Sequence, residues 1–408
     1  MTHSTETYVA DARFLDGFSN LLHRKPPGSW ISNSSHSKNS NYWREKLLGY
    51  LDKMLSGGNY TPIQHSKHLE FFSQWVIPLL GPKPRSVNGE YVPIFNSYMC
   101  DDYTPIELSL AWKSASSKPM VRVGIEPLPT DEQADLSQIV AYGLRVIDSL
   151  QQVSQYPDSA FTNYFALDTS LFLEILEIIG FSNGQFRKGP MIVSNIFLGF
   201  DLLPGHVQLK AYCILNNALD PIEKHALVSK VISAYAKDTA ASAILTYFQS
   251  KPASWYSTSS PEPFIIGVDC TGTRDARIKI YVRYNVTDFE QIVDQLSLGG
   301  RIPVSLACIA ALRDLWYRFV ADDSDPFLRP SHTSGIPFYY EFNTTKSLPS
   351  VKVNIPVRLM GKTDQAITAI TADWLGNHTQ FSKCRYPFLT TVSKTWYGNY
   401  FLLGRTPL

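Results

Sequence analysis

The chain of 408 residues is 44% apolar and 18% charged, a composition that favours a large folded core over extensive disorder. Its 37 basic and 36 acidic residues nearly cancel, so the charge excludes no fold but gives no reason to expect nucleic acid or a membrane as partner. Five scattered cysteines without a CxxC pair indicate neither a disulfide framework nor a zinc site. With no signal-like start and no apolar run of about 18 residues, a cytoplasmic protein is expected.

Taken in chain order, residues 1–40 are polar and rich in serine and are predicted to be a flexible leader, and residues 41–408 a single domain. Hydrophobic spacing predicts helices over 42–55 and 64–80, followed by extended segments over 91–99, 105–112 and 120–128. Helices are predicted next over 131–152 and 168–180, strands over 191–200 and 207–215, a helix over 221–248, and strands over 262–269 and 276–284. The last third has predicted helices over 286–298 and 303–320, strands over 336–343 and 350–358, a helix over 363–375, and an extended pair over 377–383 and 387–396.

Two strands and two helices therefore alternate about five times along the chain. Strands joined as hairpins predict an antiparallel sheet of about ten strands, with the helices covering its outer face. Closing such a sheet would remove its exposed edges and enclose a lumen wide enough for ligands.

Strict alternation over residues 277–284 is typical of a strand that presents different side chains to its two faces. The apolar members are Ile278, Ile280 and Val282, and the polar members are Arg277, Lys279 and Tyr281. Two other predicted strands repeat the pattern of a lysine followed two residues later by a polar residue. They carry Lys210 with Tyr212 and Lys352 with Asn354.

The three lysines lie 69 and 73 residues apart, which indicates one structural unit used again. If the three strands belong to one sheet, its polar face carries a column of cations and phenols. Such a face, once enclosed, is costly unless an anion neutralises it. We therefore infer a bound polyanion, most simply a diphosphate.

Several motifs in a fixed order resemble a known family. They are Tyr42-Trp43, Met54-Leu55, Tyr60, Gln64, Leu69, Phe71-Phe72, Val76, Pro78, Leu80-Gly81-Pro82, then Thr104-Pro105-Ile106-Glu107-Leu108-Ser109, then Arg277-x-Lys279-x-Tyr281. From about residue 40 to about residue 360 the chain resembles the fungal dimethylallyltryptophan-synthase family of aromatic prenyltransferases. The second motif resembles the acidic acceptor motif of that family, and the third resembles its diphosphate motif.

The resemblance implies an α+β fold, the ABBA prenyltransferase barrel, with ten antiparallel strands in five αββα units and the helices outside. It implies that five cations bind the prenyl diphosphate, namely Arg122, Lys210, Arg277, Lys279 and Lys352. Tyr212 and Tyr281 would shield the prenyl cation, with Asn354 at the position where the family usually has another tyrosine. Glu107 would accept a hydrogen bond from the indole N–H and is the single candidate for the base.

The chemistry of these residue types agrees with the implied reaction. Preorganised arginine and lysine side chains stabilise the charge that develops on a leaving diphosphate, so no magnesium or other cofactor is expected. Tyrosine rings attract a carbocation and exclude water, while their hydroxyls still bond phosphate oxygens. No HExxH motif and no phosphate-binding glycine loop occurs in the sequence, so no metal site is predicted.

The sequence thus predicts a prenyltransferase of secondary metabolism that moves a dimethylallyl group to an indole-containing small molecule. The departure at Asn354 leaves open a longer donor, and a phenolic or polyketide acceptor is also left open. Two different activities of the same barrel are weighed against transfer: ionisation of the diphosphate followed by cyclisation or hydrolysis, and ligand binding without catalysis. The expected partners are the donor and the acceptor, without nucleic acid or membrane, and a homodimer is left open.

Overall fold

The computed structural model describes residues 38–378 except 59, 113–118, 156–163, 182–193, 216–218, 236–239, 252–260, 273–275, 285–287, 321–334, 344–347 and 361. The expected leader therefore lies outside the described residues, apart from its last three residues, which begin the helix Lys38–Gly57. The extended segment expected over 387–396 also lies outside them, as does all but the start of the one expected over 377–383.

Helices and strands follow the predicted order closely. The helices are α3 (Lys38–Gly57), α4 (Pro62–Phe71), α5 (Leu136–Gln155), α6 (Ser170–Ile178), α7 (Pro221–Tyr235), α8 (Ala240–Gln249), α10 (Phe289–Ser297), α11 (Leu306–Val320) and α12 (Asp364–Asn377). The strands are β1 (Arg85–Val87), β2 (Glu90–Val92), β3 (Ile106–Ala111), β4 (Met120–Ile125), β5 (Phe165–Ala166), β6 (Ile196–Leu203), β7 (His206–Ile214), β8 (Glu262–Asp269), β9 (Ile278–Tyr284), β10 (Ile336–Phe342) and β11 (Ser350–Val353).

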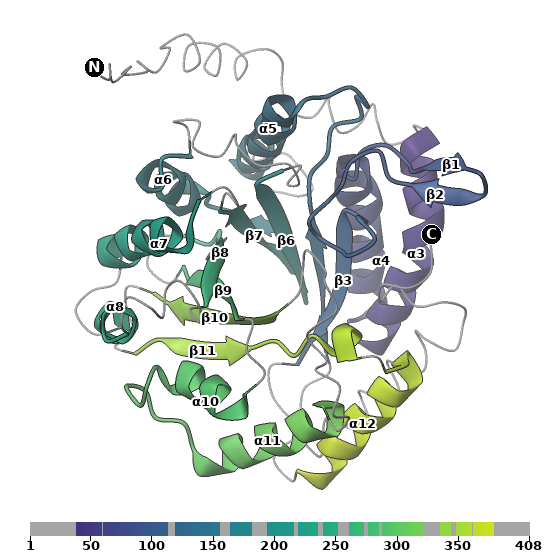
Figure 1. Cartoon of the computed structure of the whole chain (residues 1–408). Coiled ribbons are helices and arrows are strands. Elements are labelled where there is room, and N and C mark those ends of the chain that lie inside the picture. The colour runs from purple at the N-terminus through teal and green to yellow at the C-terminus, as the bar shows by residue number, and fades with distance from the viewer. Residues whose placement is uncertain are drawn as a thin grey trace, which may run out of the picture.

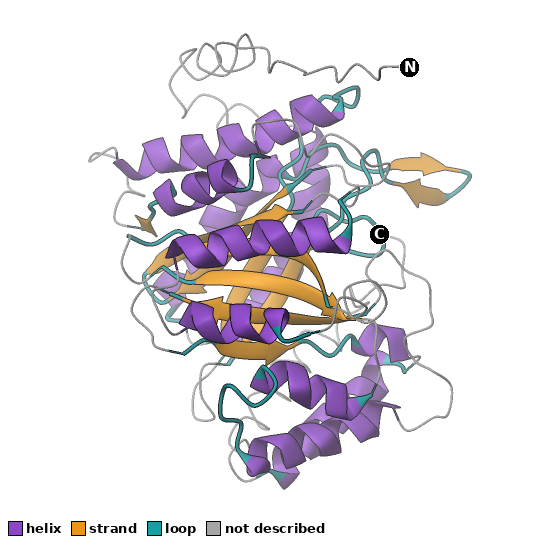
Figure 2. Cartoon of the chain, turned by 60° about the vertical axis from the view of Figure 1, so that its left-hand side comes forward, coloured by secondary structure: helices purple, strands orange, loops and turns teal. Residues whose placement is uncertain are grey.

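Eight of these strands form one antiparallel sheet in the order β11-β10-β9-β8-β7-β6-β4-β3, and the short β5 pairs with β7. Figure 1 shows the sheet curled, with the helices around its outside. Strands β1 and β2 form a separate hairpin that projects from the body in Figure 2. The arrangement confirms the predicted α+β class, with helices on one face of a curled antiparallel sheet.

Several predicted elements differ in detail. The strand expected over 350–358 ends at Val353 and is followed by a 3-10 turn (Val357–Met360). The extended segment expected over 91–99 is a strand only as far as Val92. The helix expected over 64–80 is α-helical to Phe71 and continues as a π turn (Phe72–Val76) and a 3-10 turn (Ile77–Leu79), because Pro78 has no N–H to continue the α-helical ladder. The helix expected over 221–248 is two helices, α7 and α8.

The large hydrophobic core lies between the outer face of the sheet and the helices. The apolar side chains of β9, which are Ile278, Ile280 and Val282, are at most 1% exposed and belong to this core. Their alternation with Lys279 and Tyr281 is therefore confirmed. Within the described ranges, no helix is long and apolar enough to cross a membrane.

The repeated lysine pattern reflects a repeated hairpin. Lys210 lies on β7, Lys279 on β9 and Lys352 on β11, which are the second strands of three successive antiparallel hairpins. Arg122 likewise lies on β4, the second strand of the β3–β4 hairpin. The spacing of 69 and 73 residues is thus the length of one hairpin and the helices that follow it.

Candidate active site

The strand register gathers the predicted cations on the face of the sheet opposite the helices, which we call the inner face. Residues directly opposite each other on paired strands share a face. Arg122 lies opposite Asp201, Lys210 opposite Asp269, and Lys279 opposite Glu341. The structure therefore brings the cations together and adds carboxylates that the sequence analysis did not single out.

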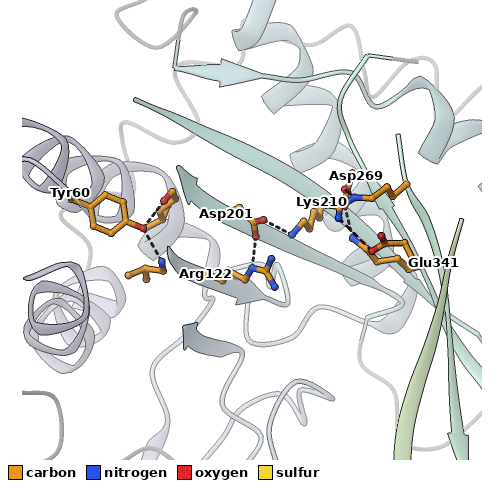
Figure 3. Close-up of polar contacts among 10 residues, drawn as sticks. Tyr60, Arg122, Asp201, Lys210, Asp269 and Glu341 are labelled. Carbon is orange, nitrogen blue, oxygen red and sulfur yellow. Dashed lines mark hydrogen bonds and ion pairs between the residues drawn. The ribbon is translucent and has the colours of Figure 1, made fainter. Parts of the chain in front are cut away.

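Each carboxylate is bound to two cations, as Figure 3 shows for Asp201. The Lys210 Nζ donates to Asp201 Oδ2 at 2.6 Å, and Asp201 Oδ1 lies 3.1 Å from Arg122 Nε. The Lys279 Nζ donates to Asp269 Oδ1 at 2.6 Å, and Asp269 Oδ2 accepts from the Arg277 Nε at 2.5 Å.

Glu341 joins the fifth cation, Lys352, to Arg277 and so to this network. Its Oε2 lies 3.5 Å from Arg277 Nη1 and 3.8 Å from Lys352 Nζ. Acidic and basic side chains therefore alternate across the inner face from β4 to β11, with the carboxylates of Asp201, Asp269 and Glu341 on the first strands of their hairpins.

These carboxylates correct one step of the sequence argument. The cationic face was expected to need an external anion for neutrality, but the protein supplies three carboxylates against five basic side chains. An excess of two positive formal charges remains for a ligand. The sequence carries a signal for the acids, because Asp201, Asp269 and Glu341 follow one another at 68 and 72 residues, nearly the spacing of the lysines.

Burial decides the electrostatics of the two inner lysines. Lys210 and Lys279 are only 4% and 5% exposed. Burial lowers the pKa of the Lys210 ammonium to about 8, against the attraction of Asp201. Burial also lowers the pKa of Lys279, with Asp269 opposing. Burial disfavours the charged form of Asp269 too, but Lys279, Lys210 and Arg277 outweigh it and hold the pKa of that carboxyl below its ordinary value.

Tyr60 fixes the two strands that carry Arg122 and Asp201. Its hydroxyl donates to the Leu202 carbonyl at 2.6 Å and accepts from the Val121 N–H at 2.8 Å. Both bonds are drawn at the left of Figure 3. One phenol therefore links β4 to β6 next to the first ion pair.

Three tyrosines lie beside the charged groups. The rings of Tyr212 and Tyr281 meet edge to face with centroids 6.1 Å apart, and the ring centroids of Tyr281 and Tyr339 are 4.9 Å apart. Lys352 Nζ lies 5.2 Å from the centroid of Tyr339. Burial raises the pKa of both Tyr212 and Tyr281, so both remain neutral hydrogen-bond donors at neutral pH. Tyr339 was not among the residues singled out from the sequence.

Tyr212 lies against Gly267, directly opposite it on β8. A Cβ at position 267 would be 2.6 Å from the Tyr212 ring and 3.4 Å from that of Tyr281. We expect Gly267→Ala to displace Tyr212 and to lower the free energy of unfolding by about 1–3 kcal/mol, the usual cost of overpacking. Chemical denaturation measures the change.

The matched control is Gly124→Ala, on the same face, where a Cβ would meet its nearest atom, the sulfur of Met99, at 3.7 Å. That distance is ordinary contact, so the Gly124 variant is expected to keep its stability. Equal stability of the two variants would contradict the packing of Tyr212 against Gly267.

Glu107 lies on β3 opposite Gly124 and shares the inner face with Ser109 and its partner Arg122. Its neighbours Ile106 and Leu108 belong to the core on the other face, as their alternation predicted. The Glu107 side chain is exposed. Asn354 is also exposed, and its backbone N–H donates to the Pro337 carbonyl just after β11.

A small aromatic cluster continues the inner face beyond the tyrosines. Tyr98, Phe197, Ile214 and Phe264 form its buried part, with Tyr212 and Tyr281 packed against it. The Arg283 guanidinium lies 4.5 Å from the Phe264 ring centroid and 5.7 Å from that of Tyr98. The inner face therefore has a charged end and an aromatic end.

Glu126 holds Tyr98 in this cluster. Its carboxylate accepts from the Ser97 hydroxyl at 2.5 Å, the Tyr98 N–H at 2.9 Å and the Ser194 N–H at 2.8 Å. Burial raises the pKa of Glu126 to about 7, although all three hydrogen bonds lower it. The loop before β3 is thus tied to the start of β6.

Comparisons with known proteins agree with this arrangement. The sequence profile of the family described as Tryptophan dimethylallyltransferase matches residues 39–386. The chain is 26% identical over 346 residues to 4-O-dimethylallyl-L-tyrosine synthase of Claviceps purpurea, covering 82% of this chain and 75% of the relative. It is 26% identical over 374 residues to a 7-dimethylallyltryptophan synthase of Aspergillus fumigatus, covering 83% and 75%.

The fold also matches solved structures. The crystal structure of NotF in complex with brevianamide F and DMSPP superposes with a TM-score of 0.67 at 21% identity, over 91% of this chain and 89% of that one. The prediction of an ABBA barrel is therefore confirmed.

Proposed function

Because the chain belongs to the tryptophan dimethylallyltransferase family and is an aromatic prenyltransferase, we propose that it moves a dimethylallyl group from its diphosphate to an indole-containing small molecule. The observation that carries the donor half is the inner face, where five basic side chains adjoin three tyrosine rings. The acceptor half rests on Glu107 and on the relative whose name specifies tryptophan as the prenylated molecule, while the relative named for tyrosine corresponds to the phenolic alternative.

The first step is ionisation of the donor. The carbon–oxygen bond breaks heterolytically, and the diphosphate leaves with the electron pair. Arg122, Lys210, Arg277, Lys279 and Lys352 stabilise the charge that develops on the leaving oxygens, which is the role that preorganised donors play most effectively away from water. The allyl cation that remains lies against the tyrosine rings, whose faces attract it.

The second step joins the cation to the acceptor ring. An aromatic carbon forms the new carbon–carbon bond, and the ring then loses a proton to recover aromaticity. Glu107 accepts a hydrogen bond from the indole N–H, which orients the ring and increases its electron density. We propose that Glu107 is also the base that takes the proton lost by the ring. The aromatic cluster around Tyr98 and Phe264 is the neighbouring surface on which a flat acceptor packs.

We propose that transfer needs no magnesium. The positive charge that a metal supplies in other diphosphate sites comes here from side chains, and the carboxylates that a metal would bind are engaged by lysine and arginine. A divalent ion would have to displace those cations.

Donor length and acceptor class are tested together. The purified protein is incubated with dimethylallyl, geranyl or farnesyl diphosphate and with tryptophan, tryptophan-containing cyclic dipeptides or phenols, and the products are identified by mass spectrometry. The expected product is a dimethylallylated indole. Transfer only from a longer donor, or only to a phenol, would replace that part of the proposal.

Two further outcomes would show that the barrel does not transfer the prenyl group. Release of diphosphate without acceptor would indicate cyclisation or hydrolysis of the donor. Tight donor binding without turnover would indicate a binding barrel.

Tyr339 favours the short donor, because it places a third ring beside Tyr281 although Asn354 supplies none.

A further inference from the structure

Two aspartates occupy equivalent positions in the candidate donor site. Asp201 and Asp269 are 4% and 2% exposed, and each accepts a 2.6 Å hydrogen bond from a buried lysine, Lys210 or Lys279. A buried ammonium is strongly disfavoured without a partner. Each aspartate therefore provides the charge that its lysine needs in the absence of ligand.

The second oxygen of each aspartate contacts a less buried arginine. Arg122 lies beside Asp201, and Arg277 beside Asp269, with side chains 39% and 33% exposed. Two successive hairpins thus each pair one aspartate with one buried lysine, and an arginine contacts each aspartate, Arg122 from the preceding hairpin and Arg277 from just before β9. A repeated grouping indicates a common task.

We propose, building on the proposed donor site, that Asp201 and Asp269 are positioning residues that keep Lys210 and Lys279 protonated and fixed in place before the donor binds. The site is then charged in advance, and the diphosphate enters without having to bring a proton to a neutral lysine. Neither aspartate takes part in bond making or breaking.

The groups around Lys210 show why Asp201 decides its charge. Asp201 on β6 and Asp269 on β8 are the acids that face it, and Arg122 on β4 and Lys279 on β9 are the bases. Burial and the two bases lower the pKa of Lys210, and Asp201 raises it, which leaves it at about 8. Without the Asp201 charge the pKa of Lys210 falls further, so we expect a larger neutral fraction of Lys210 in the free variant near pH 7.5.

Proton uptake follows from this change. A diphosphate anion bound beside Lys210 restores its charge, so the Asp201→Asn variant must take up a proton when diphosphate binds. By linkage, the affinity of the variant for diphosphate falls as pH rises, by up to about tenfold more per pH unit than that of the native protein. This holds across the range between the pKa of Lys210 in the free variant and its pKa in the free native protein. Below that range the lysine is charged in both proteins, and the variant, which has lost a repelling carboxylate, binds at least as tightly.

Calorimetric titration with inorganic diphosphate tests the proposal. Repeating it in two buffers of different ionisation enthalpy counts the protons taken up. We expect Asp201→Asn to take up as much as about 0.7 proton more than the native protein near pH 7.5, because native Lys210, with a pKa of about 8, is already about three-quarters charged at that pH. Asp201→Glu, which keeps the charge, is expected to restore the native value.

Asp294→Asn is the matched control, because Asp294 on α10 also accepts a 2.7 Å bond from a lysine, Lys251, but lies in the helical layer. It is expected to leave proton uptake unchanged. Equal weakening of diphosphate binding by Asp201→Asn at every pH, without added proton uptake, would overturn the proposal.

If the Asp201 variant fails to fold, the same titration on Asp269→Asn, with Lys279 as the titrating group, decides the question. A native protein that binds no diphosphate would instead refute the donor site itself and, with it, the role of both aspartates.

Discussion

Replacing Lys279 with methionine is expected to lower kcat by about 10²–10³-fold, the usual effect of removing one preorganised donor from a developing anion. The ammonium of Lys279 is buried among the inner-face charges and donates to Asp269. The fold is expected to survive, because Asp269 keeps the Arg277 guanidinium as its second partner. Steady-state kinetics and thermal denaturation measure the two effects separately.

Lys224→Met is the matched control. Lys224 on α7 is 1% exposed and is paired with Glu262, so it is a buried lysine outside the inner-face cluster. Its removal leaves Glu262, whose side chain is 41% exposed and hydrated, so the loss of the ion pair itself is expected to cost little stability, and the variant is expected to turn over normally. Full activity in the Lys279 variant would remove the diphosphate assignment.

Replacing Glu107 with glutamine is expected to lower kcat by about 10²–10⁴-fold, the range for loss of a general base. The amide keeps the shape of the side chain but accepts a proton poorly and attracts the indole N–H less. Binding of inorganic diphosphate is expected to be unchanged, since Glu107 has no place in the donor half of the proposal. Product formation and calorimetric titration give the two readings.

Glu90→Gln, in the separate β1–β2 hairpin, removes a comparable exposed strand glutamate and is expected to change neither quantity. A Glu107 variant that turns over normally would rule out the base. A Glu107 variant that chiefly loses diphosphate binding would show that Glu107 helps to bind the donor rather than the acceptor.

The strands and the orientation of their cations could be predicted because both depend on local patterns. The alternation around Lys279 fixes which side chains share a face, and the recurrence of a lysine in three strands reveals the repeated hairpin. These are properties of sequence spacing, and the register observed for Lys210 and Lys279 agrees with them.

The inner-face carboxylates were missed because their meaning depends on pairing between strands. Asp269 follows the apolar run of a strand, as many solvent-exposed acids do, and only its position opposite Lys210 and next to Lys279 makes it a counter-ion. The same holds for Tyr339. Asn354 pointed to a gap in the aromatic shield, but a ring from β10 lies opposite Lys352 and beside Tyr281.

Helix details depended on single residues whose effect is conformational. Pro78 changes the end of the predicted helix over 64–80 into a π turn and a 3-10 turn, although the apolar spacing continues through it. Periodicity reports which side is buried, and the two turns still bury Phe72, Val76 and Ile77.

The central claim is that the side chains of the inner face ionise the donor without a metal. The most direct measurement is the initial rate of dimethylallyl transfer to an accepted indole, by the metal-stripped native protein, with EDTA and then with excess magnesium. The proposal predicts the same rate in both conditions. Transfer that occurs only after magnesium is added would contradict it, because the basic side chains of the inner face would then not be sufficient to ionise the donor.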